Sequence, residues 1–103
     1  MELGLSTHWN ASRNADGEAM IRQILELGIR RVELGYDLVY PLIDGVKRMV
    51  KSGEVSVVSV HNFCPVPPGA LHGHPEIFEL ASPDDRIRHA AVVHTRRTLE
   101  FAS

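Results

Sequence analysis

Residues 55–60 form the stretch that most constrains how this chain can fold. Valine stands at both odd and even positions of the run, which passes into His61 before three prolines follow between positions 65 and 68. A β-branched run that is apolar on both parities is typical of a strand covered on both faces in a parallel sheet. We therefore predict a buried strand over 55–60 that ends in polar side chains.

Residues 2–7 and 31–36 are predicted to form two further strands. Leu3 and Leu5 give the first of these segments an alternating pattern, and apolar residues flank Glu33 in the second. A buried carboxylate without a partner is energetically costly. We therefore expect Glu33 to have a partner or to lie at the rim of the sheet.

Apolar residues recur at helical spacing in three other segments, which predicts helices over 17–27, 38–52 and 82–103. Asp16 and Asp37 stand where the N-caps of the first two helices belong, because a carboxylate can accept a free amide hydrogen of the first turn. Gly28 is placed to end the first helix in the left-handed conformation. Pro41 falls in the first turn of the second helix, where a missing amide hydrogen costs little.

The last helix has a strong start signal in the sequence Ser82-Pro83-Asp84-Asp85. A hydroxyl at the cap, a proline at the first position and acids in the first turn all favour a helix N-terminus. One face carries a thin stripe of mostly small residues, namely Ile87, Ala90, Ala91, His94, Thr98 and Phe101. We expect this stripe to pack closely on a sheet, with His94 as a packing residue.

Residues 62–81 show no periodicity and are rich in proline and glycine. Loops of this length in compact domains are usually functional or mobile. His72 and His74 lie in this segment, but no carboxylate or thiolate accompanies them in a metal-binding spacing. We interpret these two histidines as solvated loop residues.

The order strand, helix, strand, helix, strand, loop, helix indicates an α/β fold built from three consecutive βα units around a parallel sheet. A length of 103 residues suits one domain, 1–103. Ligand sites in such sheets gather at the carboxyl ends of the strands. His8 and Trp9 follow the first strand, Gly35 and Tyr36 end the second, and His61, Asn62 and Cys64 follow the third.

Composition and charge limit the partners and the compartment that we expect for this chain. A formal net charge of −2 gives no long-range attraction for nucleic acid. No apolar run approaches the roughly 18 residues of a membrane span, and no basic segment precedes an apolar one at the N-terminus. The single cysteine agrees with a reducing compartment. We therefore expect a cytoplasmic protein without membrane or nucleic-acid partners.

Three segments together resemble a known family: Val32-Glu33-Leu34, then Val60-His61-Asn62-Phe63-Cys64-Pro65, then the helix from Arg88 to Ala102. They are similar to the N-terminal portion of xylose isomerase-like TIM barrels, a superfamily with sugar isomerases and epimerases, inosose dehydratases and family 2 AP endonucleases. Complete barrels of this kind have eight βα units in about 250 residues. The resemblance therefore implies the first part of a barrel, truncated after its third helix.

The same resemblance implies a metal-dependent isomerase or epimerase acting on a small sugar or polyol. Such an enzyme abstracts a proton beside a carbonyl group polarised by a divalent ion, Mn²⁺ or Zn²⁺. Most metal ligands of the family lie on later strands, so this chain is expected to be inactive alone and to hold little or none of the metal site. The implied roles are a metal ligand or substrate contact at His61, a catalytic or supporting carboxylate at Glu33, and substrate contacts at His8, Trp9, Asn62 and Cys64.

Each of these residues also has a plain structural interpretation. His61 can bond to a neighbouring loop, Glu33 can pair with Arg31, Trp9 can be core, and Cys64 can be a small buried thiol. Two other functions stay open. One is a zinc phosphodiesterase of the AP endonuclease type, which the acidic balance disfavours. The other is a non-enzymatic half-barrel module that forms a homo-oligomer through its exposed sheet edge.

Overall fold

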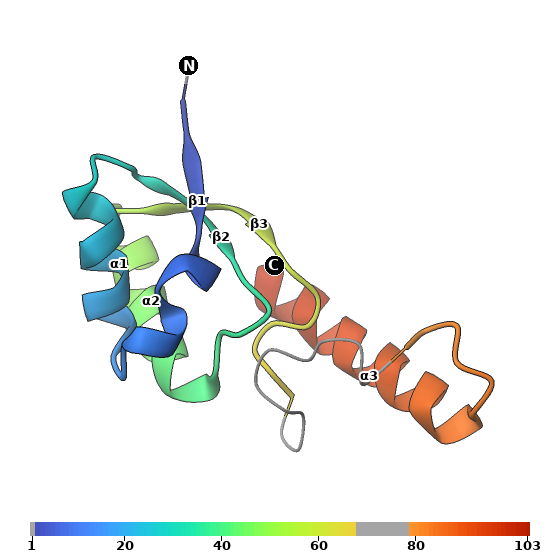
Figure 1. Ribbon diagram of the computed structural model, residues 1–103. Coiled ribbons are helices and arrows are strands. Elements are labelled where there is room, and N and C mark those ends of the chain that lie inside the picture. The colour runs from blue at the N-terminus through green and yellow to red at the C-terminus, as the bar shows by residue number, and fades with distance from the viewer. Residues whose placement is uncertain (1, 68–78) are drawn as a thin grey trace.

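The computed structural model describes residues 2–67 and 79–103, which form an open three-stranded parallel sheet with helices between and after the strands. The strand order is β1-β2-β3 (Figure 1). The elements are β1 Gly4–Ser6, the 3₁₀ turns η1 Thr7–Trp9 and η2 Ala11–Arg13, α1 Gly17–Glu26, β2 Arg31–Leu34, α2 Tyr40–Lys51, β3 Ser56–Val60 and α3 Asp85–Ala102. The predicted α/β class with three βα units is confirmed.

The register of the sheet separates its two faces. Val32 of β2 pairs with Val57 of β3, and Leu34 pairs with Val60. Val32 and Leu34 are buried in the core with side chains of α1 and α2. Glu33 points to the opposite face because successive residues of a strand alternate. An irregularity between Val32 and Glu33 shifts the β3 register by one residue.

Helix α1 forms as its sequence predicts. The Asp16 carboxylate accepts a hydrogen bond from the Glu18 backbone N–H at 3.1 Å, which confirms Asp16 as the N-cap. Met20, Ile21 and Ile24 form the buried stripe. Gly28 follows the C-cap with a φ of +80°, the left-handed conformation predicted for it.

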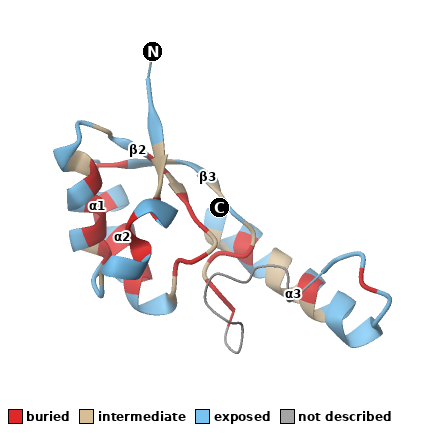
Figure 2. Cartoon of the chain, viewed as in Figure 1, coloured by how far each residue is buried: buried red, intermediate tan, exposed pale blue. Residues whose placement is uncertain are grey.

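Helices α1 and α2 approach each other through two glycines. A Cβ atom on Gly17 would lie 1.9 Å from the Leu42 carbonyl oxygen, and one on Gly45 would lie 2.3 Å from the Glu18 nitrogen. No side chain fits at either position, so the two helices touch backbone to backbone. Figure 2 shows the buried residues concentrated between this helix pair and the sheet.

Two predicted helix caps are wrong. Helix α2 begins at Tyr40 after Val39, without a side-chain cap, and Pro41 lies in its first turn as expected. Asp37 lies before the helix because its carboxylate is held by His8. In α3 the cap is Asp84, which accepts hydrogen bonds from the N–H groups of the first turn. The Ser82 hydroxyl instead accepts the backbone N–H of Asp84, the N-cap residue itself.

Strand β3 differs from the prediction of a strand covered on both faces. Val58 is 47% exposed, and Ser56 and Ser59 are exposed as well. Within the described part of the chain, β3 has a strand neighbour only on the β2 side. The valine-rich pattern therefore reflects strand propensity here, because burial also requires a neighbouring element that local sequence does not specify.

Helix α3 also packs less than its apolar stripe predicts. Of its residues only Ala91 and Thr98 are buried. Figure 1 shows α3 projecting away from the sheet, with the C-terminal end of the helix beside the sheet, and the longest dimension of the molecule is accordingly 44 Å.

Backbone contacts fix the segment after β3, since the Val66 N–H donates to the Leu38 carbonyl at 2.9 Å.

Part of the predicted loop over 62–81, including His72 and His74, lies outside the described residues. Among the helices that the structure describes, none combines the length and the apolar character needed to cross a membrane.

Candidate functional site

Three aromatic side chains form a row at the carboxyl ends of the three strands. His8 follows β1, Tyr36 follows β2 and His61 follows β3. The ring centroids of His8 and Tyr36 are 4.8 Å apart, and those of Tyr36 and His61 are 5.1 Å apart. We call His8, Tyr36 and His61 the ring row. Its position is the one where parallel sheets usually bind ligands.

Backbone contacts hold the strand ends that carry the ring row. The Gly35 N–H donates to the buried Thr7 hydroxyl at 2.9 Å, which ties the end of β2 to the end of β1. A Cβ on Gly35 would lie 3.1 Å from the His8 nitrogen, so glycine allows this close approach. The His61 N–H donates to the Leu34 carbonyl at 2.8 Å and prolongs the β2–β3 pairing.

Asp37 lies behind the ring row and contacts its first member. Its Oδ2 is 3.0 Å from Nδ1 of His8, and its side chain is 6% exposed whereas that of His8 is 55% exposed. A carboxylate can only accept hydrogen bonds, so Nδ1 of a neutral His8 carries the hydrogen and Nε2 carries the lone pair. That Nε2 lies 3.4 Å from the Tyr36 hydroxyl.

His61 is exposed, and its Nδ1 lies 2.7 Å from the carbonyl oxygen of Asn62. Since a carbonyl only accepts, Nδ1 of a neutral His61 also carries the hydrogen, and its Nε2 can bind a donor or a cation. The ring row therefore presents two imidazole acceptors with a phenol between them.

The structure places Glu33 outside the ring row. Its Oε2 accepts a hydrogen bond from the Ser59 hydroxyl at 2.7 Å, across the β2–β3 pair. Arg31, the pairing partner considered from the sequence, instead forms an ion pair with Glu2. Glu33 thus lies on the sheet face opposite the helices with a neutral partner.

The side chains of the other three predicted substrate contacts have their neighbours outside the ring row. Trp9 stacks with Arg13, whose guanidinium lies 5.0 Å from the ring centroid. The Asn62 amide donates to the Thr95 hydroxyl of α3 at 3.0 Å. Cys64 is fully buried in the core, and its backbone N–H donates to the Thr98 hydroxyl at 2.9 Å.

The environment of Cys64 suppresses thiolate formation. Burial raises the pKa of its thiol to about 12, and the negative charge of Asp37 contributes in the same direction. Reactive cysteines have the opposite trend, because a nucleophile or metal ligand needs the thiolate. The thiol of Cys64 therefore behaves as a small apolar core group.

The described residues offer few metal ligands in one place. Among residues 2–67 and 79–103, no three His, Cys, Asp or Glu side chains gather in a group that could hold a metal ion. His61 Nε2 is a free ligand atom at the strand ends, and a divalent ion there would need further ligands from elsewhere.

The sequence places Tyr36 at the carboxyl end of the second strand without assigning it a role, and sequence reasoning missed Asp37 as a residue of the site. Both follow β2 directly, as His8 follows β1 and His61 follows β3. The position after a strand was therefore the available signal. Asp37 was instead assigned to a helix cap, which a local pattern favours equally.

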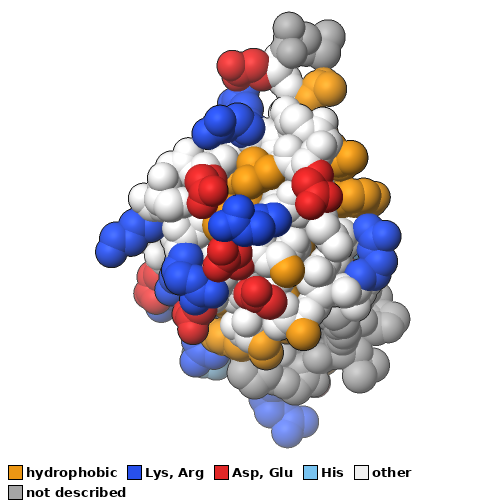
Figure 3. Space-filling view, turned by 90° about the vertical axis from the view of Figure 1, so that its left-hand side faces the viewer, with side chains coloured by type: hydrophobic (Ala, Val, Ile, Leu, Met, Phe, Trp, Pro, Cys, Tyr) orange, Lys and Arg blue, Asp and Glu red, His pale blue; other side chains and the backbone are white. Residues whose placement is uncertain are grey.

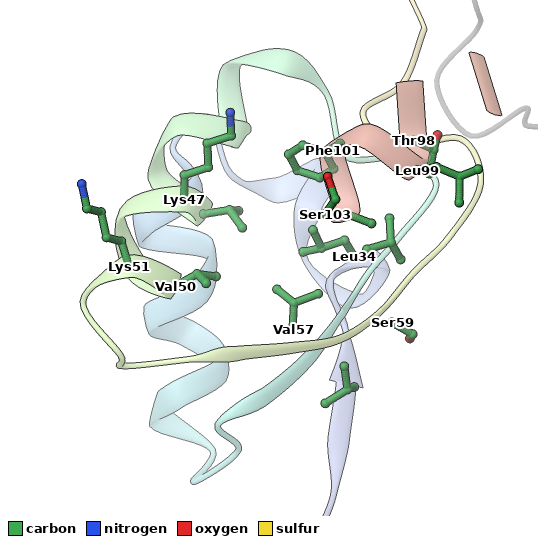
Figure 4. A pocket seen from close by; sticks show the side chains of 14 residues that line it. Leu34, Lys47, Val50, Lys51, Val57, Ser59, Thr98, Leu99, Phe101 and Ser103 are labelled. Carbon is green, nitrogen blue, oxygen red and sulfur yellow. The ribbon is translucent and has the colours of Figure 1, made fainter. Parts of the chain in front are cut away.

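A separate apolar pocket of about 530 Å³ lies between α2, β3 and the C-terminal end of α3. Figure 4 shows its lining side chains, among them Leu34, Val57, Leu99 and Phe101. The Lys47 ammonium lies 5.8 Å from the centroid of the Phe101 ring. None of the ring row residues lines this pocket, so it is distinct from the candidate site.

Comparisons of this chain with protein-family models, with curated proteins and with solved structures found no match.

Proposed function

We propose that this chain forms the first three βα units of a xylose isomerase-like barrel and contributes to the isomerisation or epimerisation of a sugar or polyol. The observation that carries the proposal is the ring row, in which His8, Tyr36 and His61 meet at the carboxyl edge of the sheet. The resemblance of residues 32–34 and 60–65 to that superfamily supports it.

The chemistry of the ring row suits a polyhydroxylated ligand. Imidazole Nε2 atoms accept hydrogen bonds from hydroxyl groups, and a phenol both donates and accepts. Aromatic ring faces match the apolar C–H faces of a sugar. The half-exposed His8 and the exposed His61 leave these groups within reach of a small molecule.

Each predicted residue has a limited role in this proposal. His61 Nε2 contacts the substrate or one divalent ion, and Glu33 supports the open face of the sheet through Ser59. A bound Mn²⁺ or Zn²⁺ would supply Lewis-acid polarisation of a carbonyl oxygen. Its remaining ligands would come from groups other than those described.

The test is an assay of the product of the whole natural reading frame on a panel of ketoses and polyols, with and without a chelator. We expect interconversion of at least one ketose pair, lost with chelator and restored by Mn²⁺ or Zn²⁺. Failure to convert any of the panel, or equal rates with and without chelator, would contradict the proposal.

The alternative of an AP endonuclease-like phosphodiesterase receives less support. DNA binding favours a clustered basic surface. On the face shown in Figure 3, Lys and Arg side chains alternate with Asp and Glu. Arg22 pairs with Glu18, and Arg48 lies within 4 Å of both Asp16 and Glu18. These pairs neutralise two of the cations that could otherwise contact phosphates.

A second candidate function, a self-associating module, is favoured by the exposure of β3. An outer strand edge pairs readily with another strand edge, and a second copy offers the same edge of β3. Val58 on that strand is exposed, and Leu99 of α3 nearby is 65% exposed. We expect a concentration-dependent dimer by analytical ultracentrifugation that Val58→Lys disrupts. A monomer at high concentration would contradict this candidate.

A further inference from the structure

The two ring nitrogens of His8 have different surroundings. On one side, Nδ1 contacts a carboxylate whose side chain is 6% exposed, and on the other, Nε2 faces the Tyr36 hydroxyl. Asp37 is 29 residues away in sequence, so the tertiary fold places it there. A buried carboxylate commonly sets the tautomer of a functional histidine in this way.

The contact between His8 and Asp37 is fixed from both ends. The Ser6 hydroxyl accepts the His8 N–H at 3.2 Å, which sets the start of η1. Gly35 lies between the two partners, and its missing Cβ would lie 3.1 Å from both the His8 nitrogen and Oδ1 of Asp37. The imidazole therefore has a defined orientation and a defined tautomer, with its lone pair on Nε2.

The contact on the Nε2 side is weaker. The Tyr36 oxygen lies 3.4 Å from Nε2, near the upper limit for a hydrogen bond, whereas the contact with Asp37 is 3.0 Å. A ligand hydroxyl at normal hydrogen-bond distance would therefore compete well with the phenol. The half-exposed His8 side chain leaves space from which such a hydroxyl can approach.

We propose that Asp37 is a positioning residue that holds His8 as the Nδ1–H tautomer, so that its Nε2 accepts a hydrogen bond from a ligand hydroxyl in place of Tyr36. The identity of the ligand as a sugar or polyol rests on the function proposed above. The tautomer and its dependence on Asp37 do not.

The first experiment reads the tautomer directly. Two-bond ¹H–¹⁵N correlation spectra of the full chain at neutral pH show which imidazole nitrogen of His8 carries the hydrogen. We expect the Nδ1–H form in the wild-type chain. In Asp37→Asn the new amide can donate to Nδ1, so we expect the Nε2–H form to gain population. Asp44→Asn replaces an exposed carboxylate of α2 and should leave the His8 pattern unchanged.

The second experiment uses D-fructose as the probe and follows the His8 Nε2 signal during a titration. We expect a saturable shift in the wild-type chain and an affinity about tenfold lower in Asp37→Asn, the loss of roughly one hydrogen bond. Asp44→Asn, which keeps the carboxylate at position 37, should bind D-fructose as tightly as the wild-type chain does. The amide fingerprint of each variant shows whether it is folded.

The outcomes separate this inference from the proposed function. An Nε2–H tautomer in the wild-type chain, or a tautomer that Asp37→Asn leaves unchanged, overturns the inference whatever the enzymatic assay shows. If the His8 signal of the wild-type chain does not respond to D-fructose, the proposed hydrogen bond from a ligand hydroxyl to Nε2 of His8 is overturned. The predicted tautomer and response together with no ketose conversion by the natural gene product would overturn the proposed function alone.

Discussion

The hydroxyl of Thr98 on α3 accepts the backbone N–H of Cys64 at 2.9 Å and itself donates to the His94 carbonyl at 3.1 Å. Both Thr98 and Cys64 are buried. This one side chain therefore fastens the segment after β3 to a helix that otherwise buries little surface. The Asn62–Thr95 and Val66–Leu38 hydrogen bonds hold the same segment at two other points.

Replacing Thr98 with valine should destabilise the protein by about 1–3 kcal/mol, because the buried N–H of Cys64 loses its acceptor while the side-chain volume is kept. Urea unfolding followed by circular dichroism measures the change. Thr98→Ser keeps the hydroxyl and should cost about 1 kcal/mol for the lost methyl group. Equal stability of Thr98→Val and wild type would show that the contact has no energetic role.

Cys64 should resist alkylation in the folded protein. Because burial raises the pKa of its thiol from 9.0 to about 12, the thiolate fraction near neutral pH falls roughly a thousandfold. Mass spectrometry after iodoacetamide treatment should show slow labelling under native conditions and rapid labelling in urea. Rapid labelling of the folded chain would contradict the buried position of Cys64.

A side chain at Gly45 should disrupt the packing of α1 on α2. The Cβ of an alanine would lie 2.3 Å from the Glu18 nitrogen, so the helices must move apart. We expect Gly45→Ala to destabilise the fold by about 3 kcal/mol, at the upper end for overpacking. Gly4→Ala is the matched control, because its Cβ would lie at an ordinary 3.4 Å from the nearest atom. Equal unfolding midpoints for the two variants would argue against the close approach.

His94 should make stability sensitive to mild acid. Burial, helped by the positive charge of Arg97, lowers the pKa of His94 below its ordinary value of 6.5. The unfolded chain then binds a proton that the folded chain resists, so stability falls as the pH drops below about 6.5. We expect His94→Gln to reduce the fall in Tm between about pH 7 and about pH 5, whereas His89→Gln on the exposed side of α3 should not. A steeper fall in the Tm of His94→Gln than in that of the wild type would contradict a lowered pKa of His94.

The order of elements could be predicted because each element carries its own local signal. The α1 stripe of Met20, Ile21 and Ile24, the Asp16 cap and the left-handed Gly28 all depend on neighbours in sequence, and all three are found. The cap at Asp37 failed because a distant residue, His8, holds the carboxylate that a local rule assigns to the helix. The cap predicted at Ser82 is wrong by two residues, since Asp84 offers a competing cap.

The candidate site could be predicted only in part. The sequence places His8, Tyr36 and His61 at the carboxyl ends of strands, but their contact as a row depends on the register of the three strands, which the local sequence does not specify. The coverage of β3 depends on what lies next to it, which no pattern within residues 55–60 specifies. The burial of Cys64 follows from its place under α3 rather than from its place after a strand.

The central claim is that the ring row binds a sugar or polyol. The most direct measurement is a titration of the uniformly labelled chain with D-fructose and with myo-inositol, followed by NMR at every assigned backbone and ring position. Saturable shifts concentrated at His8, Tyr36 and His61, and abolished together by His8→Gln, are the predicted result. Shifts that are absent, or that centre on the apolar pocket lined by Leu99 and Phe101 instead, would contradict the claim.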